Sequence, residues 1–224
     1  MVCAVVTLKK IVRMAESRDQ ESNVLLQQAA AGDQAAAHRL LEIHRERLRA
    51  MIALRLDRRL SARVDPSDVL QETMIQAHQK LPEYLRTQPI PFYPWLRRMA
   101  WENIVQLHRQ HLLAQARSVT REERFDVGLP DQSVLDLAER LMAKGSSASQ
   151  RLIQKELKTR VQTALGQLDA RDREVLVLRF LEQLSIDEAA AVLEISQEAV
   201  KSRQRRALER FSELIDATIA GDLT

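Results

Sequence analysis

Residues 185–208 have the sequence SIDEAAAVLEISQEAVKSRQRRAL, which contains two helix starts close together. Ser185 and Glu188 have the spacing of a capping box, in which the serine side chain caps the helix and the glutamate bonds back to the serine amide. The helix that they open, over residues 186–193, is short and rich in alanine, and Ser196 then caps a second helix. A short helix, a tight turn and a second helix predict a helix-turn-helix.

The second of these helices has a basic face suited to DNA. Val200, Ala207 and Leu208 are expected to pack inward. The start of such a helix meets base edges in the major groove, where arginine and lysine suit guanine and glutamine suits adenine. The candidate base-reading residues are Gln197, Lys201, Ser202, Arg205 and Arg206, with Arg203 and Arg210 placed for phosphate contacts. The alternative is an amphipathic helix whose basic face is only solvated.

Two further features frame the motif. Asp169 is expected to cap an earlier helix that runs as far as Leu181. Glu194 occupies the turn position at which glycine often supplies a left-handed backbone, and a non-glycine residue there costs about 1 kcal/mol.

The composition of the whole chain favours helices. Of 224 residues, 45% are hydrophobic but only 4% are aromatic, and 5 Gly and 6 Pro argue against a sheet protein with many turns. The formal net charge is +3, but clustered arginines alternate with an acidic zone over residues 65–83, which indicates two kinds of partner, one of them a polyanion. Cys3 is the only cysteine, so an internal disulfide and a cysteine-based zinc site are excluded.

Helical periodicity predicts an all-α protein of two helical domains joined by a flexible linker, with the helix-turn-helix in the C-terminal domain. The sequence leaves open whether Met1 or Met14 is the true start. We expect an N-terminal extension without fixed structure (1–23), an N-terminal domain (24–114), a linker (115–150) and a C-terminal domain (151–224).

The N-terminal domain contains a helix with an acidic and amide stripe. Asp65 is expected to be its N-cap and Pro66 its first residue. Its apolar face consists of Val69, Thr73, Ala77 and Leu81. The stripe consists of Asp68, Gln71, Glu72 and Gln79. Because DNA repels carboxylates, the stripe suits a basic protein surface, the alternative being a solvated face.

The segment from Arg86 to Pro94 is expected to be a loop with three prolines, followed by another helix. Leu96, Met99, Ala100 and Leu107 are its expected core residues. Outside that core, the arginines Arg97, Arg98 and Arg109 lie among Phe92, Tyr93, Trp95 and Trp101. Basic residues interleaved with aromatics can hold single-stranded DNA by charge and stacking, although Trp95 is alternatively a core residue.

In this order, the segments resemble the sigma factors of bacterial RNA polymerase, specifically the compact extracytoplasmic-function group. Residues 165–180, LGQLDARDREVLVLRF, look like the start of the family's domain 4, and residues 184–190 and 200–207 match its helix-turn-helix. Residues 65–73, DPSDVLQET, look like the part of domain 2 that binds the polymerase, and residues 92–100, FYPWLRRMA, look like the part that opens the promoter.

The resemblance implies a role for each surface. Core polymerase binding, through the coiled coil of the β′ subunit, would fall to Asp65, Asp68, Gln71 and Glu72. Recognition of the −35 element would fall to Gln197, Lys201, Ser202, Arg203, Arg205, Arg206 and Arg210. Capture of the −10 element would fall to Tyr93, Trp95, Arg97, Arg98, Trp101, Asn103 and Arg109. Helix residues around Leu176 and Leu181 would belong to the domain that meets the β flap.

The chain departs from the family pattern at three places, one of which is Gln106, where the family often has aspartate. The family usually has asparagine where Glu102 stands, and Asn103 follows one position late. The usual Gly-Thr before Val200 is Glu198-Ala199. The sequences of the −10 and −35 elements are therefore open.

The resemblance implies a cytoplasmic protein, monomeric when free, that binds core RNA polymerase and promoter DNA, needs no cofactor and does not enter a membrane. Many relatives are held by an anti-sigma factor, but nothing in this sequence identifies one. The main alternative is a helix-turn-helix regulator that binds DNA as a dimer without acting as a polymerase subunit. An enzyme is not expected, because the chain has no phosphate loop, zinc motif or nucleophile with a base. His108 and His111 could share a metal, but no carboxylate is spaced to join them, so no metal site is expected.

Overall fold

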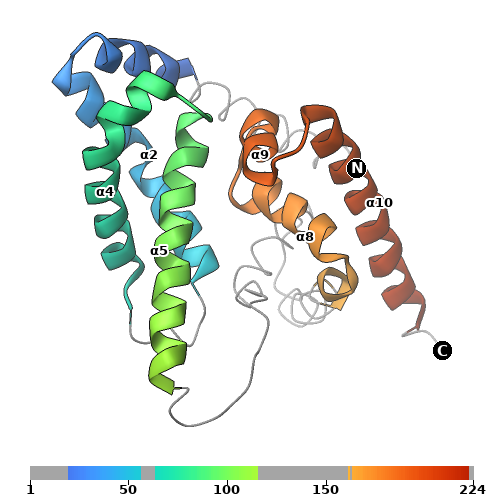
Figure 1. Ribbon diagram of the computed structural model, residues 1–224. Helices are drawn as coiled ribbons and strands as arrows, with labels where there is room; N and C mark the ends of the chain where they lie inside the picture. The colour runs from blue at the N-terminus through green and yellow to red at the C-terminus, as the bar shows by residue number, and fades with distance from the viewer. Residues whose placement is uncertain (1–19, 57–63, 116–160, 162, 222–224) are drawn as a thin grey trace, which may run out of the picture. The chain divides into compact units, whose positions relative to one another are not determined.

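A computed structural model describes residues 20–56, 64–115, 161 and 163–221, and these contain helices and turns but no strand (Figure 1). The chain divides into two compact units. The described residues up to 115 belong to an N-terminal unit, and those from 161 onward to a C-terminal unit. The predicted all-α architecture of two helical regions is confirmed. The predicted linker lies almost wholly outside the described residues.

The N-terminal unit is built from a helical segment over residues 20–30 and three longer helices, α2 (Gln34–Arg55), α4 (Pro66–Thr87) and α5 (Phe92–Gln115). The three long helices pack against one another in every pairing. Their buried faces share a core that includes Leu40, Leu48, Leu81, Leu96 and Ile104. Figure 1 shows α4 and α5 side by side.

The first helical segment begins before the expected domain start at residue 24. Ser22, which we expected in a disordered extension, is buried, and its Oγ lies 2.8 Å from Nε2 of the buried His44 on α2. The ring of His44 in turn packs against Phe92 of α5 at 5.4 Å between centroids. The helical segment is therefore part of the folded unit from before residue 24, with Ser22 packed against α2.

The connection between α4 and α5 is shorter than predicted. We expected a loop over residues 86–94, but α4 continues to Thr87 and α5 begins at Phe92. Pro94 fits in the first turn of α5 because the amide that proline lacks has no partner within the helix at that point. The chain turns at Gln88, which ends α4. Its backbone is left-handed (φ 37°), and its amide donates to the Tyr84 carbonyl at 2.8 Å.

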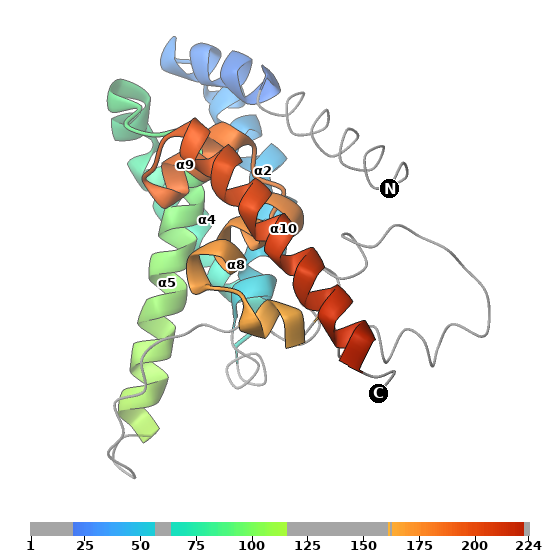
Figure 2. The same cartoon turned by 90° about the vertical axis from the view of Figure 1, so that its right-hand side faces the viewer.

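The C-terminal unit contains α8 (Ala170–Leu176), the π-helical turn η1 (Val177–Leu181), α9 (Ile186–Leu193) and α10 (Gln197–Gly221). Asp169 caps α8 by accepting from the Arg171 amide at 2.8 Å, as predicted. The predicted helix does reach Leu181, but its last turn is widened, and the Glu182 amide donates to the Val177 carbonyl at 3.0 Å. Figure 2 shows α10 running past α8 and α9, both of which it packs against.

Arg179 holds the widened turn against its neighbours. Its guanidinium donates to the Leu184 carbonyl and, at 3.0 Å, to Oε1 of Gln204 on α10. Desolvation lowers the pKa of Arg179, and the charge of the buried Glu188 at the start of α9 acts in the opposite direction. This one side chain therefore connects η1, α9 and α10.

The helix-turn-helix forms as the sequence predicted. The Glu188 amide donates to Ser185 Oγ at 3.2 Å, and the Ser185 amide donates to Glu188 Oε2 at 2.8 Å, which completes the capping box. Glu194 adopts the left-handed backbone (φ 54°, ψ 41°) that ends α9. Ser196 Oγ accepts from the Ala199 amide at 3.1 Å and caps α10.

Candidate nucleic-acid and protein interfaces

The outer face of α10 carries the predicted DNA-reading residues. Val200, Ala207 and Phe211 are buried against the rest of the unit, which fixes the rotation of the helix, and Leu208 is half-buried. Of the seven predicted residues, Arg203 is half-buried, and the exposed ones are Gln197, Lys201, Ser202, Arg205, Arg206 and Arg210. Arg205 is paired with Glu209 one turn later, Nη1 to Oε1 at 3.0 Å. This face is therefore accessible and mostly cationic.

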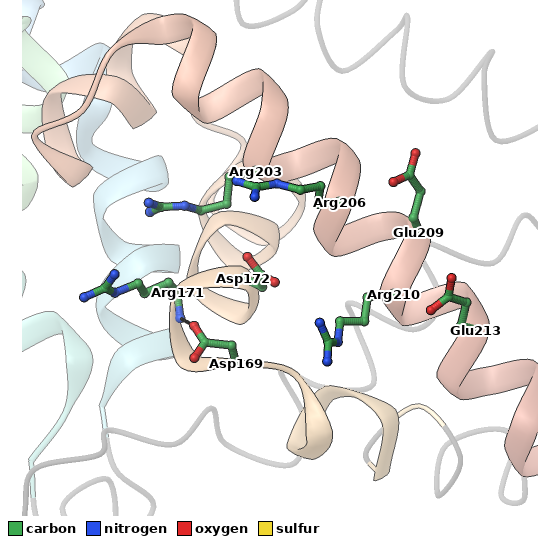
Figure 3. A pocket seen from close by; sticks show the side chains of 8 residues that line it. All are labelled: Asp169, Arg171, Asp172, Arg203, Arg206, Glu209, Arg210 and Glu213. Carbon is green, nitrogen blue, oxygen red and sulfur yellow. Dashed lines mark hydrogen bonds between the residues drawn. The ribbon is translucent and has the colours of Figure 1, made fainter.

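A groove of about 420 Å³ lies between α10 and the start of α8 (Figure 3). Arg203, Arg206 and Arg210 line it from α10. Asp169, Arg171 and Asp172 line it from the start of α8. Sequence reasoning missed the α8 residues, because nothing local links them to a helix that begins far along the chain. In this groove, the arginines of α10 therefore lie near one further cation, Arg171, and near the carboxylates of Asp169 and Asp172.

The predicted polymerase-binding residues lie at the start of α4 and are exposed. Asp65 is the N-cap, its carboxylate accepting from the Ser67 amide at 2.7 Å, and this backbone hydrogen bond lowers the pKa of Asp65. Asp68, Gln71 and Glu72 follow on the solvent side of the helix. The α4 stripe, defined as Asp68, Gln71, Glu72 and Gln79, is thus a solvent-facing surface opposite the buried face of the helix.

A second groove, of about 240 Å³, runs beside this stripe between α4 and α5. Asp68 and Glu72 line it from α4, and Asn103 and Leu107 line it from α5. Asn103, which we predicted at the −10 surface, is only 9% exposed, and its Nδ2 donates to Thr73 Oγ1 at 3.0 Å. The structure therefore places Asn103 in the α4–α5 packing, next to the stripe.

The other predicted −10 residues divide into a buried and an accessible group. Tyr93 is 2% exposed, with the Arg47 guanidinium 3.5 Å from its ring centroid, and Arg97 is 7% exposed. Trp95 and Trp101 are half-buried, and Arg98 and Arg109 are exposed. The sequence could not separate the two groups, because aromatic and arginine side chains alternate along this helix.

Two accessible residues, Trp95 and Arg98, line a third groove, of about 320 Å³, where the end of α4 meets α5. Trp95, Arg98 and Glu102 line it from α5, and Lys80 and Thr87 line it from α4. Glu102 Oε1 accepts from Arg98 Nε at 3.2 Å, so this carboxylate is paired within its own helix. Lys80 and Thr87 were missed, since no local sequence pattern links the second half of α4 to α5.

Two kinds of feature are absent from the described part of the chain. It holds no group of three His, Cys, Asp or Glu side chains placed to bind a metal ion. Within the same residues, no helix has the length and apolar character needed to cross a membrane.

Comparison with known proteins identifies two sigma-factor regions in this chain. Residues 42–113 match the family model "Sigma-70 region 2", and residues 164–212 match "Sigma-70, region 4". RNA polymerase sigma factor CnrH of Cupriavidus metallidurans is 30% identical over 201 residues, which is 89% of this chain and 96% of that protein. ECF RNA polymerase sigma factor SigD of Mycobacterium tuberculosis is 29% identical over 201 residues, covering 89% of this chain and 85% of SigD.

A solved structure of CnrH, in complex with the cytosolic domain of CnrY, aligns with a TM-score of 0.48 and 28% identity, covering 88% of this chain and 98% of that one. The two sigma regions occur in the order that the sequence predicted, and a DNA-binding regulator that acts apart from the polymerase is not favoured. The chain belongs to the RNA polymerase sigma factors of the extracytoplasmic-function type, which direct the polymerase to specific promoters.

Proposed function

We propose that the two units divide the work of promoter recognition by the chemistry of their exposed faces. The α10 face binds the −35 element in the major groove, and the α4 stripe binds a basic surface of core polymerase, the β′ coiled coil. One observation carries this proposal: the ionised side chains between Lys201 and Arg206 of α10 are all cations, whereas those of the α4 stripe, Asp68 and Glu72, are both carboxylates. Phosphates attract the former and repel the latter.

For the −10 element, the proposal uses the accessible residues beside the third groove. Arg98 and Lys80 supply positive charge there, beside the carboxylates of Glu83 and Glu102, and the half-buried Trp95 supplies an aromatic edge against which a base can stack. Trp101 and Arg109 extend the same helix. Tyr93, Arg97 and Asn103 support this surface from within the unit and do not contact DNA themselves.

The remaining expectations follow from membership of the family. The protein acts in the cytoplasm, where promoters are, and has no catalytic activity of its own. Leu176 is fully buried and Leu181 half-buried, so of these two only Leu181 is available to the β flap. CnrH, a relative, has been solved in complex with the cytosolic domain of CnrY. Binding assays on this chain test whether a protein partner covers one of these faces.

The test combines two variants with sigma-free core RNA polymerase. Asp68→Arg is expected to lose core binding, because it puts a cation in a surface that meets cations. Arg206→Ala is expected to bind core as the wild type does but to lose selective initiation, because a lost base contact costs about 1–3 kcal/mol. Binding is measured by fluorescence anisotropy of labelled protein, and initiation by mapping transcript start sites on fragmented genomic DNA.

Two matched controls keep the test specific. Glu42→Arg reverses an exposed charge on α2 and Arg45→Ala removes an exposed arginine there, and both are expected to behave as the wild type. A wild-type protein that ignores core polymerase and binds duplex DNA as a dimer would overturn the proposal.

A further inference from the structure

An exposed isoleucine lies on α4. The side chain of Ile75 is 47% exposed, and within the described residues the other large hydrophobic side chain exposed to this degree is Val24, at 54%. Single exposed hydrophobic residues are common and need no explanation by themselves. What distinguishes Ile75 is its position on the helix.

Packing within the unit does not account for this isoleucine. Thr73 and Ala77, two positions before and after it, are both fully buried. At about 3.6 residues per turn, a step of two residues turns the helix by about 200°, so Ile75 faces directly away from the core. Its side chain is therefore not part of the buried core that α4 shares with α2 and α5.

The same rotation puts Ile75 at the centre of the α4 stripe. Gln71 and Glu72 lie one turn before it, Gln79 lies one turn after it, and Asp68 lies two turns before it. Residues three, four and seven positions apart share one face of a helix. An apolar side chain therefore has mainly polar neighbours on this face, namely the carboxylates and amides of the stripe and the exposed His78 three positions after it, which is the arrangement of an interface with an apolar centre and a polar rim.

The groove beside the stripe adds a second indication of the partner's chemistry. Its walls include the carboxylates of Asp68 and Glu72 and the apolar side chains of Val69 and Leu107. A lysine or arginine can lay its methylene stem on apolar surface while its charged head meets a carboxylate. Ile75 and the groove both offer such surface within reach of the same two carboxylates.

We propose that Ile75 is the apolar contact at the centre of the surface by which this sigma factor binds core polymerase. The polymerase segment that covers it presents several lysine or arginine side chains, whose stems pack on Ile75 and whose heads meet Asp68 and Glu72. This inference rests on the proposed function of the α4 stripe.

The experiment measures the affinity of full-length variants for sigma-free core RNA polymerase. Ile75→Ala is expected to weaken binding about 10-fold, because a central apolar contact contributes more than its rim. Ile75→Arg is expected to weaken it further by repelling the basic partner. Val24→Ala is the matched control, since it truncates the other exposed hydrophobic residue of the same unit, and it is expected to bind as the wild type does. Alanine favours helix, so thermal unfolding followed by circular dichroism should show both alanine variants folded.

The outcomes separate this inference from the function on which it rests. Loss of binding in Asp68→Arg with unchanged binding in Ile75→Ala overturns the role of Ile75 and leaves the α4 stripe as the polymerase surface. Unchanged binding in Asp68→Arg overturns the proposed function of the stripe itself. Equal weakening in Ile75→Ala and Val24→Ala also overturns the inference, because the effect would then not belong to α4.

Discussion

Tyr84 illustrates how burial alone changes the chemistry of a residue. Its ring lies in the junction of α4 and α5, with centroids 4.5 Å from Trp95 and 5.3 Å from Phe92, and its hydroxyl donates to the Ile90 carbonyl at 2.8 Å. Desolvation raises the pKa of Tyr84 from 10.0 to about 12. Burial at this junction therefore favours the neutral phenol of Tyr84 over its ionised form.

We predict a loss of stability at alkaline pH from this residue. The unfolded chain ionises Tyr84 near pH 10 and the folded chain near pH 12, so the stabilisation is complete below about pH 10 and falls as the pH rises to about 12. The full loss is on the order of 2–3 kcal/mol. Urea midpoints measured from about pH 9 to about pH 11 should fall more steeply for the wild type than for Tyr84→Phe. Parallel slopes for the two proteins would contradict this explanation.

Asn103 shows that a polar residue in a helix proposed to bind DNA can be structural. Its side chain lies in the interface of α4 and α5, donating to Thr73 Oγ1 and meeting Gln76. Glu102, one residue earlier, faces solvent and pairs with Arg98. The one-residue offset of this asparagine from the family pattern therefore moves the side chain from the outer surface to the interior.

At the scale of elements, the turn between α9 and α10 lies between two capping residues. Glu194 ends α9 with a strained, left-handed backbone, and Ser196 caps the start of α10. Glu194 has the left-handed backbone that the sequence predicted for this position. Glycine adopts this conformation without the penalty from a Cβ atom, although it loses more conformational freedom on folding.

Glu194→Gly is therefore expected to stabilise the C-terminal unit by about 0.5–1 kcal/mol. Glu198→Gly, four residues later in the first turn of α10, should destabilise it by a similar amount, about 0.5–1 kcal/mol, because glycine is a poor helix former. Thermal unfolding of the two full-length variants, followed by circular dichroism, measures both effects. Destabilisation in both would show that the strain at Glu194 is negligible.

At the scale of the whole molecule, the net charge hides the functional pattern. The chain has 34 basic and 31 acidic residues apart from histidine, a difference of +3, which by itself attracts DNA weakly. The described structure shows how the charges are sorted: cations between Lys201 and Arg206 of α10, carboxylates on the first half of α4, and both signs later in α10 and within the groove between α8 and α10. Attraction to DNA therefore depends on a few local contacts.

Arg210→Ala should test this sorting through salt dependence. Because Arg210 lies beyond the base-reading part of α10, we expect its loss to weaken binding of the polymerase holoenzyme to promoter and unrelated duplexes alike. The slope of log K against log salt should fall in magnitude by about one. Arg206→Ala should instead weaken mainly the promoter duplex, and Arg45→Ala, which removes the same charge from α2, should change neither. A wild-type slope in Arg210→Ala would mean that this arginine contacts no phosphate.

The sequence by itself determined the local features of this protein. The capping box at Ser185, the N-caps Asp65 and Asp169, the left-handed Glu194 and the helix of residues 186–193 each depend on residues a few positions apart, and each is present in the structure. The same holds for the buried face of α4, because one helical period specifies it. The short α4–α5 connection was missed because proline was taken to end a helix, whereas in a first turn it is tolerated.

Only the tertiary structure decided which candidate side chains remain accessible. Tyr93, Arg97 and Asn103 are of residue types that occur in DNA-binding surfaces, but packing against α2 and α4 buries them. Arg171 and Arg203 line one groove although their helices are distant in sequence. Lys80 and Arg98 line another groove, between two helices joined by a short turn. Local patterns specify helices and their apolar faces, but burial depends on the neighbour that each face meets, and that neighbour is chosen by the packing of the whole unit.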